Sequence, residues 1–134
     1  FSGGWRPLST WLSAIADIGT TVLVRRGRAG RDIAIVAPSD AAASEHLIEV
    51  AMAVTPEDAS LVIFTALEVR PWIERLQSAT GRKIRVEPRP AEVQGVVARL
   101  RRLAPGLIAI DATENPAVRH ALLEGTRGDL LIVT

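Results

Sequence analysis

The chain has 134 residues, enough for one domain with a substantial hydrophobic core. Its formal net charge is only +1, which argues against a dedicated nucleic-acid-binding protein, because such proteins usually carry a strongly basic face. It contains no cysteine, which excludes disulfides, thiolate nucleophiles and thiolate metal sites.

Residues 1–31 differ in composition from the rest, and we treat them as an N-terminal segment of their own. A Gly/Pro-containing linker comes first, and Ser9 or Thr10 is then positioned to cap a short helix. The run Thr20–Val24 follows, extended or helical, and residues 25–31 contain four arginines. One interpretation is a helix packed on the domain and then a solvated basic loop. The other is a juxtamembrane segment with its arginines on the cytoplasmic side.

The segment Trp11–Val24 is too short to cross a bilayer, which needs about 20 apolar residues, and Asp17 interrupts it. The chain begins at Phe1 and ends at Thr134, directly after an apolar run. We therefore expect a domain taken from a longer protein.

From Asp32 onward, short apolar runs alternate with helical patterns. The runs are Ile33–Ala37, Leu61–Thr65, Ile84–Glu87, Leu107–Asp111 and Leu130–Val133. The helices are expected at Ala41–Val54, around Glu68–Thr80, from Pro90 or Ala91 to Ala104, and from Pro116 through Leu123. Parallel strands need long return connections, which are usually helices. Residues 32–134 are therefore predicted to form a three-layer α/β domain. Its five-stranded parallel sheet has the order 3-2-1-4-5 with helices on both faces, and the N-terminal helical or extended segment is additional to it.

We expect the central residues of these runs to be nearly fully buried, namely Ile35, Val62, Ile63, Val86, Ile108, Ile110, Leu131 and Ile132. The last run, Leu130–Val133, has no charge or proline to protect a sheet edge. It must therefore pair with a second copy of the chain or be covered. We favour Thr20–Val24 as an internal cover, because that run is itself strand-like.

In doubly wound sheets, ligands bind outside the carboxyl ends of the strands, where the winding direction reverses. The four segments found there are Ala37–Asp40, Thr65–Ala66, Pro88–Pro90 and Asp111–Pro116. None of them contains a glycine, although phosphate sites usually need glycines to expose backbone N–H groups. No Gly-rich phosphate loop or dinucleotide fingerprint occurs elsewhere in the chain.

The candidate ligand-binding residues at these strand ends are Ser39, Asp40, Asp111 and Thr113. Asp40 and Asp111 would hold a cation if they meet at the reversal point, and otherwise they cap helices. We assign no catalytic residue, no metal and no cofactor.

Other charged side chains have simpler interpretations. His46 and His120 lie within predicted helices and are expected at the helix surface or core edge rather than as catalytic bases. Arg99, Arg101 and Arg102 form a basic cluster on the third helix. This cluster is either a solvated face or a surface for an anionic partner.

The order and lengths of these units resemble the universal stress protein family. Asp32–Ala51 resembles that family's opening strand, its Asp-Gly-Ser tip and the helix after it. Pro90–Asp111 resembles its third helix and fourth strand, and Ala121–Val133 resembles its closing helix and strand. The resemblance covers about 100 residues and is mostly architectural.

The departures from that family concern its nucleotide site. Nucleotide-binding members carry an aspartate at the position matched here by Ala37, and a glycine-rich loop after the fourth strand. Here Asp111–Pro116 leads directly into a helix. The resemblance therefore implies that ATP binding has been lost.

Degenerate domains of this type occur as cytosolic parts of amino-acid transporters, cation–chloride cotransporters and cation/proton antiporters. Our first hypothesis is therefore a non-catalytic regulatory or dimerisation domain of a membrane transporter, at the cytosolic face of the membrane. Its expected partners are its own transmembrane domain and a second copy, with no nucleic acid. The alternatives are a stand-alone module that binds a nucleotide or other small ligand, and an enzyme using Asp40, Asp111 and Glu114.

Overall fold

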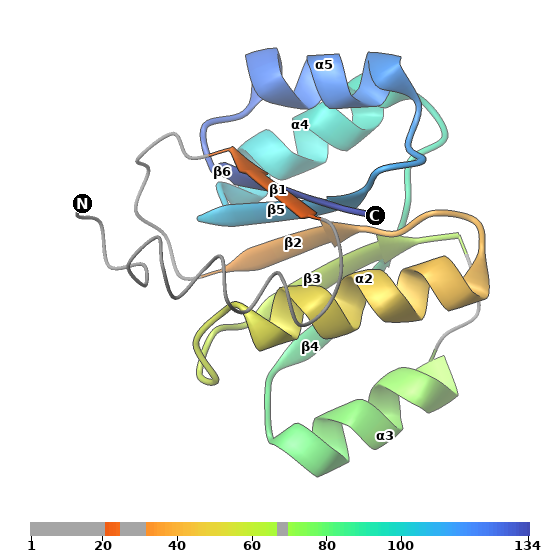
Figure 1. The fold of residues 1–134 in the computed structure, drawn as a ribbon, viewed down its shortest axis with the longest axis vertical. Coiled ribbons are helices and arrows are strands. Elements are labelled where there is room, and N and C mark those ends of the chain that lie inside the picture. The colour runs from red at the N-terminus through yellow and green to blue at the C-terminus, as the bar shows by residue number, and fades with distance from the viewer. Residues whose placement is uncertain (1–20, 25–31, 67–69) are drawn as a thin grey trace.

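The structure is a computed structural model that describes residues 21–24, 32–66 and 70–134. Strands and helices alternate along the chain (Figure 1). In chain order the elements are β1 (Thr21–Val24), β2 (Ile33–Val36), α2 (Ala41–Ala53), β3 (Leu61–Thr65), α3 (Arg70–Thr80), β4 (Ile84–Pro88), α4 (Val93–Leu103), β5 (Leu107–Asp111), α5 (Pro116–Gly125) and β6 (Asp129–Val133).

The strands form one six-stranded sheet in the order β1-β6-β5-β2-β3-β4. The strands from β2 to β6 are all parallel to their neighbours, which confirms the predicted order 3-2-1-4-5 for the five apolar runs. The winding direction reverses between the adjacent strands β2 and β5, where Ile33 is in register with Leu107. The carboxyl ends of these two strands therefore define the expected ligand-binding crevice.

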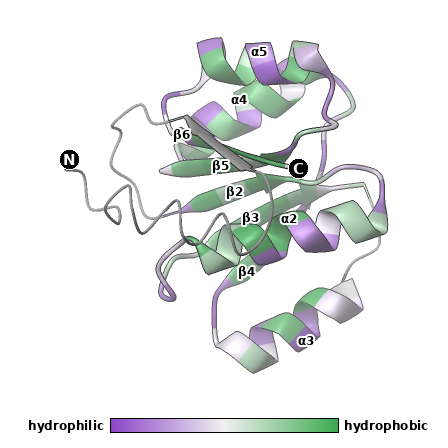
Figure 2. Cartoon of the chain, viewed as in Figure 1, coloured by the Kyte–Doolittle hydropathy of each residue, from purple (hydrophilic) through white to green (hydrophobic). Residues whose placement is uncertain are grey.

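The strands are largely apolar, as their green colour in Figure 2 shows, and the sheet separates two apolar cores. On one face, Ile35 and Ile63 belong to the cluster that includes the buried side of α2 and Ile73 of α3. On the other face, Ile108 and Ile110 pack with α4 and α5. Side chains alternate between the two faces along each strand, so a strand buried on both sides is apolar at almost every position.

Two of the residues predicted to be nearly fully buried are only half-buried, and that prediction was wrong for them. Val86 lies on β4, the last strand of the sheet, and Ile132 lies on β6 near the other margin. Near its margins a sheet has fewer neighbouring side chains and less helix cover. The other predicted core residues, Ile35, Val62, Ile63, Ile108, Ile110 and Leu131, are buried.

The helix ends show local polar capping. The carboxylate of Asp40 accepts a hydrogen bond from the Ala43 N–H at 2.8 Å, and the side chain of Asn115 accepts one from the Ala117 N–H at 2.9 Å. Gly81 follows α3 with a φ of +71°, the left-handed conformation that glycine adopts easily. The helix α4 begins at Val93, later than predicted, because Glu92 has an extended backbone and serves as its N-cap, with the Gly95 N–H donating to the Glu92 carbonyl.

The strand β1 covers one margin of the sheet. It pairs antiparallel with β6, with Thr21 in register with Val133 and Val24 with Leu130. This confirms that Thr20–Val24 supplies internal cover for the last strand, through residues 21–24. The short helix predicted after Ser9 or Thr10 lies outside the described residues.

The opposite margin, β4, is protected by side chains instead. Gln77 of α3 donates to the outward-facing Ile84 carbonyl at 2.9 Å, Pro88 lacks an N–H, and Arg85 and Glu87 place charges on the strand. Charges and proline are usual ways to block edge-to-edge pairing. Within residues 21–24, 32–66 and 70–134, no helix has both the length and the apolar character needed to cross a bilayer.

Candidate functional site

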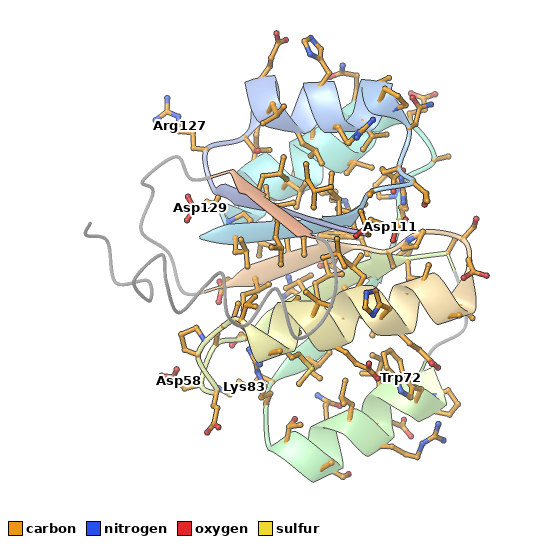
Figure 3. All side chains as sticks on the ribbon, in the orientation of Figure 1. Asp58, Trp72, Lys83, Asp111, Arg127 and Asp129 are labelled. Atoms are coloured by element: carbon orange, nitrogen blue, oxygen red, sulfur yellow. The ribbon has the colours of Figure 1, made fainter. Side chains whose placement is uncertain are left out.

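The candidate site lies at the carboxyl ends of the parallel strands, where the topology brings the four predicted segments together. Asp111 marks this end of the sheet in Figure 3, and Asp129, at the start of β6, marks the opposite end. Backbone hydrogen bonds join these segments to the ends of neighbouring strands: the Ala37 N–H donates to the Phe64 carbonyl of β3 at 2.9 Å, and the Ala112 N–H donates to the Val133 carbonyl of β6 at 2.7 Å.

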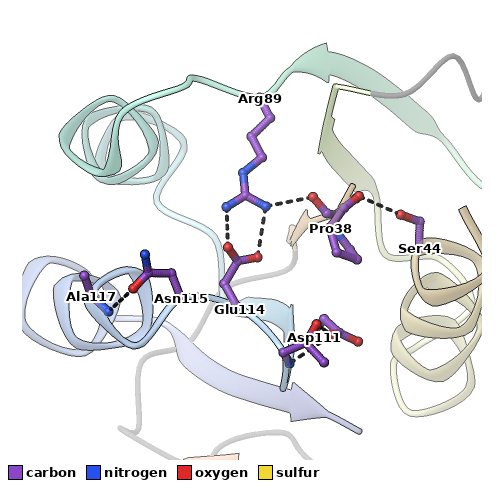
Figure 4. A network of polar contacts seen from close by, with 9 residues as sticks. Pro38, Ser44, Arg89, Asp111, Glu114, Asn115 and Ala117 are labelled. Carbon is purple, nitrogen blue, oxygen red and sulfur yellow. Dashed lines mark hydrogen bonds and ion pairs between the residues drawn. The ribbon is translucent and has the colours of Figure 1, made fainter. Parts of the chain in front are cut away.

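Arg89 spans this end of the sheet (Figure 4). Its backbone N–H donates to the Thr65 carbonyl, at the end of β3, at 3.2 Å. Its guanidinium Nη1 donates to the Ala37 carbonyl, just after β2, at 2.8 Å. Both terminal nitrogens also donate to Glu114, after β5, at 2.9 Å and 2.5 Å. One residue following β4 therefore contacts the ends of three other strands.

The ion pair between Arg89 and Glu114 is largely removed from solvent. Their side chains are 19% and 8% exposed, and the contact is bidentate. Charge-assisted bidentate pairs of this kind are stronger and more directional than single neutral hydrogen bonds. We call this pair, with its bond to the Ala37 carbonyl, the Arg89–Glu114 bridge. It occupies the reversal point with the protein's own side chains.

The loop after β2 is fixed by α2. The Ser44 hydroxyl lies 3.0 Å from the Pro38 carbonyl and 2.9 Å from the Asp40 carbonyl, and it is placed to donate to either. Asp40 uses its carboxylate as the N-cap of α2. Ser39 is exposed on the same loop. The loop's polar groups are therefore largely used in holding its own conformation.

The acidic residues at the strand ends also have local partners. One Asp111 carboxylate oxygen accepts hydrogen bonds from the backbone N–H of Thr113, at 2.9 Å, and from the Thr113 hydroxyl. Asp40 caps α2, as one of the two alternatives predicts, whereas Asp111 closes a turn with Thr113 and the N-cap of α5 is Asn115. Among the described residues, no group of three His, Asp or Glu side chains is placed to hold a metal ion.

The two histidines lie on α2 and α5 and have local partners. His46 Nε2 lies 3.1 Å from the Thr134 carbonyl. His120 contacts Glu124, one helical turn away, at 3.2 Å, and the side chains of His120 and Glu124 are more than two-thirds exposed. Neither contact places a histidine beside a nucleophile. Both residues are surface or core-edge residues, as predicted.

Sequence reasoning missed the role of Arg89, and it considered Glu114 only as an acid for the enzyme hypothesis. The signal available was weak: a basic residue after one strand and an acidic residue after another. Because parallel strands end at one edge of the sheet, opposite charges at two such ends can meet even when two strands separate them.

A cavity lies near the amino ends of β5 and β6, at the opposite end of the sheet from the candidate site. This cavity of about 440 Å³ is lined by the C-terminal turns of α4 and α5. Arg101 lines this cavity, and its Nε donates to the Gly125 carbonyl at 2.7 Å. The bond supplies a hydrogen-bond donor for a backbone carbonyl at the C-terminal end of α5. Arg101, one of the three clustered arginines, therefore has a structural role.

Comparisons with models of known protein families, with curated proteins and with solved structures found no match to this chain.

Proposed function

We propose that this chain is a non-catalytic regulatory domain with an architecture like that of universal stress proteins. The observation that carries the proposal is the Arg89–Glu114 bridge, because it fills the place where such sheets usually bind a ligand. The nearby carboxylates of Asp40 and Asp111 each accept a hydrogen bond from a backbone N–H group of their own loop or helix. These features favour a domain that works through contacts with other protein parts.

We further propose that the domain acts at the cytosolic face of a membrane as part of a transporter. Four arginines in residues 25–31 support this setting, since clustered basic residues are common next to membranes on the cytoplasmic side. The resemblance to degenerate stress-protein domains of transporters supports it as well. The partners in this proposal are the transmembrane part and a second copy of the domain.

The test is a calorimetric titration of the 134-residue chain with ATP in the presence of magnesium. We expect a dissociation constant in the millimolar range or weaker, about −4 kcal/mol, because no glycine-rich loop follows β5 and the bridge occupies the crevice. Parallel titrations with AMP and with pyrophosphate separate binding of the base from binding of the phosphates. A low-micromolar ATP affinity would contradict the proposal and favour the alternative, a stand-alone nucleotide-binding module.

A further inference from the structure

A shallow groove runs along the outer side of α4, beside the segment that follows β4. Its volume is about 350 Å³. Pro90, Gly95 and Ala98 are among the small or apolar residues that line it, and every ionisable residue of its lining is an arginine: Arg89, Arg99 and Arg102. Arg89 belongs both to this lining and to the Arg89–Glu114 bridge, so the groove adjoins the strand ends.

Two of the three arginines have hydrogen-bonding capacity to spare. Arg99 is 48% exposed and uses Nη1 for one contact with Glu87 at 3.2 Å. Arg102 is exposed, and within the part of the chain that the structure describes it has no ion pair or side-chain hydrogen bond. Residues three apart on a helix face the same side, so these two guanidinium groups can approach one anion. Arg89 differs, because its terminal nitrogens are committed to Glu114 and Ala37.

The apolar part of the groove depends on Gly95. A Cβ atom at this position would lie 2.8 Å from Pro90 Cβ, closer than real Cβ atoms approach, so only glycine lets α4 pack this near to the segment after β4. Ala98, one turn further on, adds a single methyl group. The result is an apolar strip bordered by Arg102 and by Arg99, which keeps donors to spare beside its contact with Glu87.

We propose that this groove binds a small organic oxyanion. Its aromatic or aliphatic body would rest on Pro90, Gly95 and Ala98, and its carboxylate or phosphate would lie between Arg99 and Arg102. Guanidinium groups match the geometry of both kinds of oxyanion. The volume lies at the lower end of the range for small-molecule sites.

An anionic membrane surface fits these observations less well. Recognition of lipid surfaces usually takes clusters of four to eight basic residues, roughly, whereas this groove offers two available arginines. The proposal does not rest on the proposed function, because its anion contacts come from Arg99 and Arg102 of α4 and not from the Arg89–Glu114 bridge.

The test is a titration of the ¹⁵N-labelled chain followed by amide chemical shifts, with phenyl phosphate, benzoate and inorganic phosphate as probes. We expect phenyl phosphate or benzoate to shift the amides of Gly95, Ala98 and Arg99. Arg102→Gln should weaken this binding about tenfold, the loss expected for a charge-assisted contact. The matched control is Arg75→Gln, which removes one exposed helical arginine from the opposite face of the sheet and should leave the affinity unchanged.

Ala98→Leu provides a second test, because this exposed position tolerates a larger side chain that would cover the apolar strip. It should weaken phenyl phosphate binding several-fold and leave any binding of inorganic phosphate unchanged. The proposal fails if neither organic probe shifts these amides, if Arg75→Gln and Arg102→Gln have equal effects, or if Ala98→Leu has none. It also fails if phosphatidylserine vesicles, and not the small probes, bind in a way that Arg102→Gln abolishes.

Discussion

Arg82 shows how a single buried charge can fix the connections between elements. Its side chain is 7% exposed and donates to the Ala59 carbonyl at 3.3 Å and 3.2 Å, to the Met52 carbonyl at 3.3 Å and to the Thr55 hydroxyl at 3.2 Å. Burial lowers its pKa below the usual value, while the charges of Asp58 and Glu57 act in the opposite direction. Arg82 therefore ties the end of α2 and the loop before β3 to the start of β4.

At the same scale, the core makes a direct stability prediction. Ile110 on β5 is completely buried among residues of α4, α5 and the neighbouring strands. Ile110→Ala removes apolar contacts and leaves a cavity. We therefore expect the free energy of unfolding, measured in urea, to fall by about 2–5 kcal/mol. The control is Ile132→Ala, at a half-buried position of β6, which should lower the free energy of unfolding by less. A loss under about 1 kcal/mol for Ile110→Ala would show that β5 is peripheral, contrary to the sheet order.

At the scale of elements, the sequence predicted most of the fold. Short apolar runs such as Leu107–Asp111 alternate with helical patterns along the chain. Few sheet topologies fit this alternation, because each crossover between parallel strands is long and right-handed. The prediction failed at the margins, where Val86 and Ile132 are as apolar as central residues but have fewer neighbours. Apolar character indicates that a residue belongs to a strand, and the position of that strand in the sheet decides its exposure.

The candidate site was less predictable than the fold. The absence of glycines at the strand ends was visible in the sequence, and so was the capping potential of Asp40. The partner of Arg89 was not visible, because Glu114 lies 25 residues further along the chain and meets it only through the tertiary arrangement. Likewise, the bond from Ser44 to Pro38 depends on how α2 folds back over its own preceding loop.

The pairing of β1 with β6 at the margin of the sheet leads to a prediction at the scale of elements. β6 has β5 on one side and β1 on the other, so removal of β1 would leave a row of backbone donors and acceptors unpaired. A chain lacking residues 1–31 should therefore be less stable than the full chain or should self-associate. Thermal unfolding and light scattering over a range of concentrations measure these two outcomes.

A shorter deletion serves as the control for this experiment. Removal of residues 1–18 retains β1, and the resulting chain should keep the oligomeric state of the full chain. If the chain lacking residues 1–31 is an unchanged, stable monomer, the pairing of β1 with β6 does not protect the sheet margin.

At the scale of the whole molecule, the sheet lies between two layers of helices. The helices α2 and α3 cover one face and α4 and α5 the other, and each layer packs against both β2 and β5. The Arg89–Glu114 bridge connects the segments that lead into α4 and α5, since Arg89 follows β4 and Glu114 precedes α5. The same side chains lie at the strand ends where the winding direction reverses. The proposed loss of nucleotide binding and the integrity of the domain therefore depend on the same contact.

A double-mutant cycle on this bridge is the most direct test of the account. The free energy of unfolding in urea is measured for the wild type, Arg89→Met, Glu114→Gln and the double variant. We predict a coupling energy of about 1.5–3 kcal/mol, as for hydrogen bonds between charged groups removed from water. The more exposed pair Arg99–Glu87 is the control and should couple by less than about 1 kcal/mol. A coupling energy for Arg89 and Glu114 no larger than that of the control would contradict the conclusion that this bridge closes the strand ends.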